Sequence, residues 1–200
     1  MNASTLPIAV FISGGGRSLA NLIEARDRGE LPIDIKLVIS SSSKVRGVQI
    51  AQNAGIETLV IRKSEYPAAE DYCEAMFEPC RQADVRLVVM AGFLKHVLIP
   101  DDFQQRVINI HPSLLPAFGG PGMYGIRVHQ AVIDEGAKTS GCTVHWVDNE
   151  YDNGPILLQR KCAVKANDSA ESLAARVFEL ECEALPAAIR SVANDWNSNE

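Results

Sequence analysis

Hydrophobic runs and helical patterns alternate along the N-terminal half of the chain. The apolar runs have the length of buried strands, and apolar positions between them recur every three or four residues, as in amphipathic helices. Strands are expected at 7–12, 33–40, 56–61 and 86–91, and helices at 18–28, 46–54 and 67–82. This order predicts an α/β fold whose parallel strands are joined by right-handed crossovers.

The pattern changes in the second half of the chain. Strands are expected at 107–110, 139–147 and 155–164, and helices at 127–135 and 170–193. The last two strands are joined by a short acidic loop, so we expect them to extend the sheet in antiparallel fashion. Pro186 is expected to interrupt the last helix, and the polar residues 194–200 are expected to fray.

Composition narrows the class of protein. A chain of 200 residues with 46% hydrophobic residues can build one domain with a proper core. Its net charge of −6 argues against non-specific binding to nucleic acid, which needs clustered cations. A small anionic substrate stays possible, because a local group of N–H donors can hold a phosphate.

The cysteines and the N-terminus indicate a cytoplasmic protein. The five cysteines include no Cys-x-x-Cys pair and are expected to pack in the core in a reducing compartment. The first residues lack a basic stretch followed by a long apolar run, so no signal peptide is expected. No apolar segment has the length needed to span a bilayer, so no membrane partner is expected.

An amide and an imidazole lie two residues apart at the end of a predicted strand. Alternate side chains of a strand share a face, so Asn109 and His111 are expected to project side by side while Ile110 enters the core. Pro112 discourages further strand pairing. In α/β proteins ligands bind where such strands end. The residues alone leave open whether this pair is a functional site or two satisfied polar side chains.

A glycine-rich segment follows the first predicted strand and opens the first helix. It comprises Gly14, Gly15 and Gly16, followed by Arg17 and Ser18. Glycines permit a close backbone approach, and a helix N-terminus offers N–H groups to an anion. The spacing matches neither a dinucleotide fingerprint nor a Walker A loop. We favour a phosphate site over an empty turn, with Ser18 and the backbone as donors and Arg17 assisting.

Other polar segments are given structural interpretations. The serines at 40–43 are expected to form a loop whose last members cap the next helix. His145, on a predicted strand, is interpreted as a structural histidine that could support the site without touching substrate. A carboxylate from the loop 148–155 would favour the protonated form of His111 if it lay beside that ring. No metal is expected, because the four histidines lack metal-ligand spacing.

Five segments together resemble the glycinamide ribonucleotide formyltransferase family, which uses 10-formyltetrahydrofolate in purine synthesis. They are 12–19, 90–94, 108–116, 141–145 and 151–156, in the order found in that family. The block Asn-x-His-Pro-Ser-Leu-Leu-Pro is shared by the wider formyltransferase superfamily. The resemblance covers nearly the whole chain. It implies a Rossmann-like three-layer sandwich in one domain, with a phosphate-binding half at about 1–100 and a catalytic half at about 101–193.

The resemblance also implies residue roles. Asn109, His111 and Asp152 fall on the catalytic trio of the family, and the segment from Gly14 to Ser18 falls on its substrate phosphate site. Glu181 falls on the acid that binds the substrate ribose, although the residues alone would place it on a solvated helix face. The folate pocket is implied for Leu94, Lys95, His96 and Val97, together with Asn109.

Two departures from the family pattern concern the folate tail and a loop. Many members have arginine where this chain has Lys95, and 67–70 contains no arginine. Lysine cannot make a planar bidentate fork, so the tail is held either weakly or by another cation. The loop 118–125 is longer than in some members, and its glycines suit a mobile lid.

The implied reaction is direct attack of a substrate amine on a formyl carbon, with Asn109 and protonated His111 stabilising the oxyanion. Its substrates are two small molecules, formyl-folate as co-substrate and glycinamide ribonucleotide, and the chain is expected to be a monomer or homodimer. A formyltetrahydrofolate hydrolase or a sugar-nucleotide formyltransferase is the nearer alternative. The hydrolase usually carries an extra N-terminal domain, whereas this chain starts at its first strand. A non-catalytic nucleotide-binding module is the more distant alternative.

Overall fold

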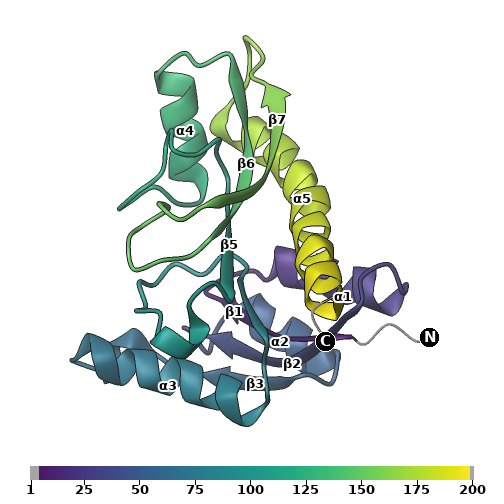
Figure 1. Ribbon diagram of the computed structural model, residues 1–200. Coiled ribbons are helices and arrows are strands. Elements are labelled where there is room, and N and C mark those ends of the chain that lie inside the picture. Colours follow the sequence, from purple (N-terminus) through teal and green to yellow (C-terminus); the bar gives the residue numbers. More distant parts are fainter. Residues whose placement is uncertain (1–4, 199–200) are drawn as a thin grey trace. The chain divides into compact units, whose positions relative to one another are not determined.

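The computed structural model describes residues 5–198 (Figure 1). Its seven strands hydrogen-bond in the order β3-β2-β1-β4-β5-β6-β7. Of the described residues, those up to Ile108 and from Ile189 onward form one compact unit, and Asn109–Ala188 form a second. The predicted α/β class, with a mostly parallel sheet and an antiparallel C-terminal extension, is confirmed.

The first unit contains four parallel strands joined by helices. In chain order its regular elements are β1 (Leu6–Ile12), α1 (Arg17–Asp27), β2 (Ile33–Ser40), α2 (Arg46–Asn53), β3 (Glu57–Val60), the short helix η1 (Lys63–Glu65), α3 (Ala69–Gln82), β4 (Leu87–Met90) and the short helix η2 (Asp101–Phe103). β1 pairs in parallel with both β2 and β4, and β2 pairs with β3. Right-handed crossovers therefore place α1 and α2 on one face of this sheet and α3 on the other.

The core of the first unit explains why its strands are nearly continuous apolar runs. All four residues of β4, and all but Pro7 of β1, are buried, as expected for strands covered on both faces. The ring of Phe77 on α3 packs edge-on against Phe11 of β1, with 5.7 Å between ring centroids, and in a tilted arrangement against Phe103 of η2 at 4.9 Å. These contacts hold the strand ends from which the loops of the first unit emerge.

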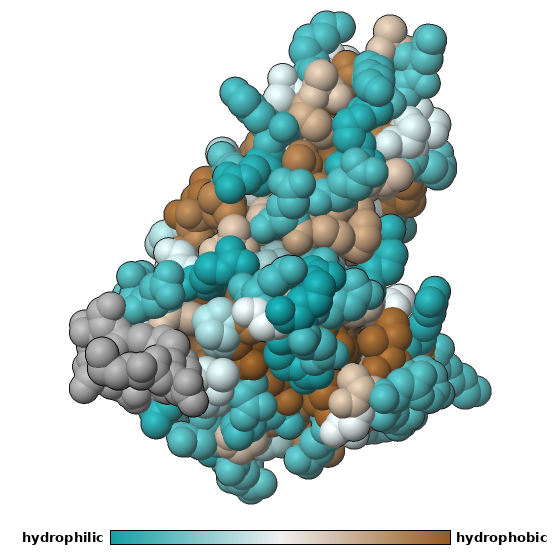
Figure 2. Space-filling view, turned by 90° about the vertical axis from the view of Figure 1, so that its right-hand side faces the viewer, coloured by the Kyte–Doolittle hydropathy of each residue, from teal (hydrophilic) through white to brown (hydrophobic). Residues whose placement is uncertain are grey.

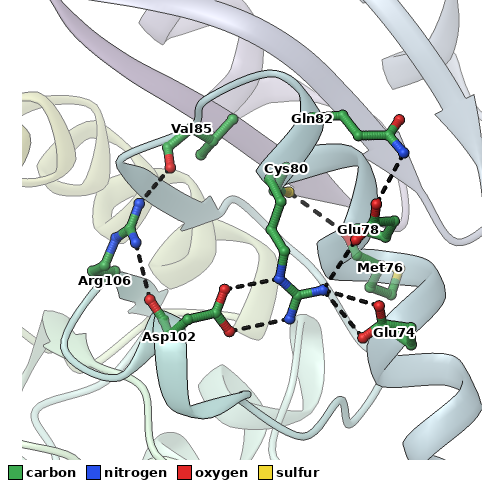
Figure 3. A network of polar contacts seen from close by, with 9 residues as sticks. Glu74, Met76, Glu78, Cys80, Gln82, Val85, Asp102 and Arg106 are labelled. Atoms are coloured by element: carbon green, nitrogen blue, oxygen red, sulfur yellow. Dashed lines mark hydrogen bonds and ion pairs between the residues drawn. The ribbon is translucent and has the colours of Figure 1, made fainter.

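A charged cluster on the surface of the first unit joins α3 to η2 (Figure 3). Arg81 donates to both carboxylate oxygens of Asp102, at 2.8 and 3.1 Å, and to Glu74 at 3.1 Å. Arg106 donates to the main-chain carbonyls of Val85 and Asp102, among others. The cluster fixes the connection that leads from β4 to β5.

The second unit carries an antiparallel strand pair. Its elements are the end of β5 (Val107–His111), α4 (Ile126–Asp134), β6 (Thr139–Trp146), β7 (Ile156–Ala163) and most of α5 (Ala170–Ser198). β6 and β7 run antiparallel with Thr143 opposite Gln159. At Gly141 an added Cβ would collide with the carbonyl of Arg160, so the close approach of the two strands requires glycine there.

The last helix differs from its prediction. α5 continues through Pro186 and extends to Ser198, so the expected interruption and a frayed segment from residue 194 are wrong, while residues 199–200 lie outside the described part. Proline removes one helical hydrogen bond. Burial of Leu185, Ala188 and Ile189 beside it stabilises the helix and offsets that loss.

The side-chain distribution corrects one more expectation. Cys73, Cys80 and Cys142 are buried free thiols, but Cys162 and Cys182 are half-buried, so core packing does not hold for all five cysteines.

Hydrophilic side chains cover most of the face seen in Figure 2, with hydrophobic ones showing between them. Within residues 5–198, the helices are too short or too polar to cross a membrane.

Candidate active site

Asn109 and His111 lie at the carboxyl end of β5, in the second unit. The strand ends at His111, directly before Pro112, as the sequence predicts. Ile110 is buried in the core, His111 is only 4% exposed, and Asn109 is half-buried. Because alternate residues share a face of the strand, the amide and the imidazole leave β5 on the same side.

The imidazole of His111 is held from both of its nitrogens. Its Nε2 atom lies 2.8 Å from the carbonyl oxygen of Phe118. A carbonyl oxygen only accepts, so Nε2 carries a proton and donates it. Its Nδ1 atom faces Oδ1 of Asp152 at 3.5 Å. A protonated ring therefore satisfies both neighbours, because each of them offers an acceptor.

His145 belongs to this cluster and fixes the orientation of Asn109. Its Nδ1 atom lies 2.8 Å from the carbonyl oxygen of Trp146, so that nitrogen is the donor. Burial lowers the pKa of His145, which favours the neutral ring with an unprotonated Nε2. The side-chain amide of Asn109 approaches Nε2 at 3.2 Å and donates one of its two protons. The second amide proton is left for another acceptor.

This contact places His145 behind Asn109, where a histidine that supports the site without touching substrate would lie. It touches Asn109 directly, and its Nε2 atom lies 3.7 Å from Oδ1 of Asp152. His145 lies near the end of β6, which is adjacent to β5 in the sheet. This adjacency, which the sequence alone does not reveal, brings the two side chains together.

Asp152 reaches the cluster from the loop between β6 and β7. Its backbone φ is +54°, a left-handed conformation that aspartate tolerates better than most residues. Its side chain is 11% exposed, and its Oδ2 atom accepts from the backbone N–H of Gly120 at 2.9 Å. At Gly154 a Cβ would collide with the carbonyl of Trp146, so the turn that positions Asp152 depends on glycine.

The loop 118–125 contributes main-chain atoms to the site. Phe118 supplies the carbonyl for His111, and Gly120 supplies the amide for Asp152. Phe118 has a φ of +57°, which is strained for a bulky side chain and costs of order 1–3 kcal/mol. Residues held in such conformations cluster at functional sites. Sequence analysis missed both residues, because a backbone group carries no side-chain signal.

The glycine-rich segment opens α1 in the first unit. Gly16 has a φ of +70°, and a Cβ there would lie 2.5 Å from the Cα of Gly47, so this position requires glycine. A Cβ at Gly14 or Gly15 would meet no atom within 4 Å in the described part of the chain. These two positions leave room for a ligand. Ser18 is half-buried, and Arg17 is exposed.

Ser13 joins three loops at this edge of the first unit. Its Oγ accepts from the backbone N–H of Leu94 at 2.8 Å and lies 2.8 Å from Oγ of Ser41. The glycine segment is thereby tied to the segment proposed for folate. The expectation that the serine run caps α2 is wrong, because α2 has Val45 at its N-cap and no side-chain cap bond among described residues.

The remaining predicted residues fall into two groups. In the first unit Leu94 is 49% exposed, Lys95 is exposed, His96 is half-buried and Val97 is buried. In the second unit Glu181 lies half-buried on α5 rather than on a fully solvated face. Burial, and to a lesser extent the charge of Glu181, raise the pKa of Cys142 on β6 to about 12.

A metal has no evident place in the described structure. Within residues 5–198 there is no group of three or more His, Cys, Asp and Glu side chains that could hold an ion. The polar cluster is instead built from one carboxylate, two imidazoles and an amide. Its chemistry is that of an N–H donor beside an imidazole–carboxylate pair, which suits stabilisation of an oxyanion.

The fold and this cluster place the chain in a known class of α/β enzymes. The sequence model of the family "Formyl transferase" matches residues 6–189. The chain therefore belongs to the formyl transferase family.

Individual relatives agree with this assignment. The chain is 45% identical over 179 residues to the chloroplastic phosphoribosylglycinamide formyltransferase of Vigna unguiculata, covering 87% of this chain and 56% of that protein. It is 35% identical to the trifunctional purine biosynthetic protein adenosine-3 of Gallus gallus, covering 97% of this chain and 19% of that protein. The chain thus spans only part of both proteins.

A solved structure matches over nearly its full length. The phosphoribosylglycinamide formyltransferase of Coxiella burnetii, in complex with CHES, superposes with a TM-score of 0.88 at 33% sequence identity. The match covers 96% of this chain and 89% of that chain. The expected formyltransferase fold is therefore confirmed.

Proposed function

We propose that this protein transfers the formyl group of 10-formyltetrahydrofolate to the amine of glycinamide ribonucleotide in purine synthesis. The observation that carries the proposal is the cluster of Asn109, His111, His145 and Asp152 at the end of β5, within a chain of the formyl transferase family. The names of the matched relatives from Vigna unguiculata and Coxiella burnetii support the choice of substrates.

Asn109 is proposed as the oxyanion donor. Attack of the neutral amine on the formyl carbon produces a tetrahedral centre with negative charge on its oxygen. One amide proton of Asn109 is held by neutral His145, so the other is directed by the same contact. A donor fixed in advance stabilises the developing charge without reorganisation.

His111 is proposed as the acid of the reaction. Its protonated ring stabilises the oxyanion by charge, and its Nε2–H changes acceptor from the Phe118 carbonyl to the substrate oxygen. The C–N bond to folate N10 then breaks, and N10 gains a proton. The amine nitrogen loses one proton in the same reaction, so the proton count balances.

Asp152 is proposed to hold the ring and to pass a proton through water. Its Oδ1 faces Nδ1 of His111, and its Oδ2 is occupied by the Gly120 amide. The carboxylate is therefore fixed toward the imidazole ring, which it orients.

Substrate binding is proposed at the loops of the first unit and at α5. The open positions Gly14 and Gly15, with Gly16, Arg17 and Ser18, would receive the phosphate at the start of α1. Glu181 would bind the ribose hydroxyls. The segment from Leu94 to Val97 would line the folate pteridine site, whose Leu94 amide is held by Ser13.

The most direct experiment measures formyl transfer from 10-formyltetrahydrofolate to glycinamide ribonucleotide, beside a reaction with water alone. We expect transfer that requires the ribonucleotide amine. Deformylation at the same rate without the ribonucleotide would assign the chain to the hydrolases. Binding of both ligands without turnover would make it a non-catalytic nucleotide-binding module.

The cellular setting is part of the same proposal. We place the protein in the cytoplasm as a monomer or homodimer that acts on small molecules and engages neither nucleic acid nor membranes. Size measurement in solution and fractionation of cells check these points separately.

A further inference from the structure

A polar clamp lies under the turn that follows His111. At its centre is Thr143 of β6, whose side chain is fully buried. Its Oγ1 donates to the carbonyl oxygen of Ser113 at 2.7 Å and accepts from the backbone N–H of Leu115 at 3.0 Å. One hydroxyl thus binds the main chain of the turn at two points.

Gln159 completes the clamp from the next strand. It is the direct cross-strand partner of Thr143 in the β6–β7 pair. Its Nε2 donates to Oγ1 of Thr143 at 2.9 Å and to the carbonyl oxygen of Leu115 at 3.0 Å. The threonine hydroxyl, with one proton and two lone pairs, is then fully used.

The clamped turn links the ring of His111 to its acceptor. His111 stands at one end of the turn, and Phe118, whose carbonyl accepts from Nε2, stands at the other. Inside the turn, Oγ of Ser113 donates to the carbonyl oxygen of Ala117 at 2.6 Å. Moving the turn would change the distance between the imidazole and the carbonyl that holds its proton.

We propose that Thr143 and Gln159 are positioning residues for His111. Their hydrogen bonds fix the main chain of the turn between His111 and Phe118, and so fix the distance between the imidazole and the Phe118 carbonyl. Neither side chain is proposed to touch substrate. The kinetic part of this inference rests on the proposed formyl transfer, whereas its structural part concerns the Nε2 proton of His111 and needs no substrate.

The test replaces Thr143 with valine, which keeps the shape and removes the hydroxyl. We expect kcat to fall about 10- to 100-fold with little change in either KM, because a small displacement of a catalytic group can cost up to about 10²-fold. Thr143→Ser keeps the hydroxyl and is expected to retain most of the turnover. Thr58→Val is the matched control, because the Thr58 hydroxyl, among the described residues, donates to the Ile56 carbonyl within the first unit and lies outside the clamp.

A second measurement follows solvent exchange of the His111 Nε2 proton by NMR in the absence of substrate. Faster exchange in Thr143→Val than in Thr143→Ser supports the clamp, even if the wild-type protein transfers no formyl group. If Thr143→Val does not fold, Gln159→Leu takes its place, with the same direction of effect and about a 3- to 10-fold loss of kcat expected for the lost hydrogen bonds.

Three results would overturn the inference. The first is a folded Thr143→Val or Gln159→Leu variant with the kcat and the proton exchange rate of the wild type. The second is an equal loss of kcat in Thr143→Val and Thr143→Ser. The third is a change in KM with kcat unaltered. Equal losses would indicate packing rather than hydrogen bonding.

Discussion

Two polar clusters in this protein differ in how far their side chains are exposed to solvent. Around Arg81 the charged groups are partly exposed, with side-chain exposures of 30% for Arg81, 48% for Asp102 and 62% for Glu74. Around His111 the side chains are buried, with 5% exposure for His111, 2% for His145 and 11% for Asp152. One cluster pairs opposite charges that are partly exposed to water, and the other gathers a carboxylate, two imidazoles and an amide away from water.

The difference shows how burial changes the role of a polar group. Exposed ion pairs are screened by water and contribute little to stability, typically about 0–1 kcal/mol each. Buried polar groups must be satisfied, and here main-chain atoms of Phe118, Gly120 and Trp146 satisfy them. Such partners leave the protons of Asn109 and His111 in defined positions, which is what a reaction needs.

The largest effect is expected from disrupting the buried cluster at Asn109 or Asp152. Asn109→Ala removes the proposed oxyanion donor, and Asp152→Asn removes the carboxylate that faces His111. Each is expected to lower kcat about 10²- to 10³-fold while the protein stays folded. Steady-state kinetics with circular dichroism as a folding check measures both, and near-normal turnover by either purified variant would contradict the assigned roles.

A smaller effect is expected at His145, which contacts the side-chain amide of Asn109. His145→Leu removes the acceptor of the Asn109 amide, and loss of one such hydrogen bond should lower kcat about 10-fold. His145→Gln can still offer an oxygen and should lose less. If the two variants lose turnover equally, the contact at 3.2 Å does not orient the amide.

In the first unit, the expected effect is on the affinity for substrate rather than on turnover. Gly15 has open space around it, so Gly15→Asp should fold normally while its charge repels a phosphate. We expect at least about a 10-fold loss of affinity for glycinamide ribonucleotide, equivalent to 1.4 kcal/mol, with little change for the folate. Gly15→Ala is the neutral control. Calorimetric titration that finds equal weakening of both ligands would contradict the phosphate site.

The exposed cluster should give the smallest effect and none on turnover. Hydrogen bonds from Arg81 hold the pKa of Asp102 below its ordinary value. A depressed folded-state pKa adds stability above the unfolded pKa of about 3.9, and this stability is lost as the pH falls through the folded pKa.

Asp102→Asn should therefore lower the free energy of unfolding by about 1 kcal/mol or less near pH 6. The difference from the wild-type protein should shrink below about pH 4. Urea unfolding at both pH values measures it, and kcat should match that of the wild type. A difference that grows on acidification would reverse the assigned sign.

Local patterns in the sequence predicted most of the fold. Every predicted strand and helix has a counterpart, because strands buried on both faces and amphipathic helices have distinct periods of hydrophobicity. Errors arose where long-range packing decided the outcome. Pro186 lies within a continuous helix because its neighbours are buried, which no local pattern reveals.

The residues of the candidate site also fall into those that local sequence patterns predicted and those that depend on tertiary contacts. Asn109 and His111 could be placed at a strand end from spacing alone, and Asp152 was assigned only through the family resemblance. The contact of His145 with Asn109 depends on β5 and β6 being adjacent in the sheet. Ser13, Phe118 and Gly120 act through contacts that depend on loop conformation, so their residue types did not single them out.

The Phe118 carbonyl has a consequence for how this site can change over time. A main-chain acceptor cannot be deleted by exchanging one side chain for another, so the partner of the His111 proton survives any replacement that preserves the backbone path. The phenyl ring is half-buried and takes no part in that hydrogen bond. Substitutions at position 118 can therefore change the side chain near the site while the hydrogen bond of His111, the proposed acid, is kept. A library of variants at this position would test substrate preference.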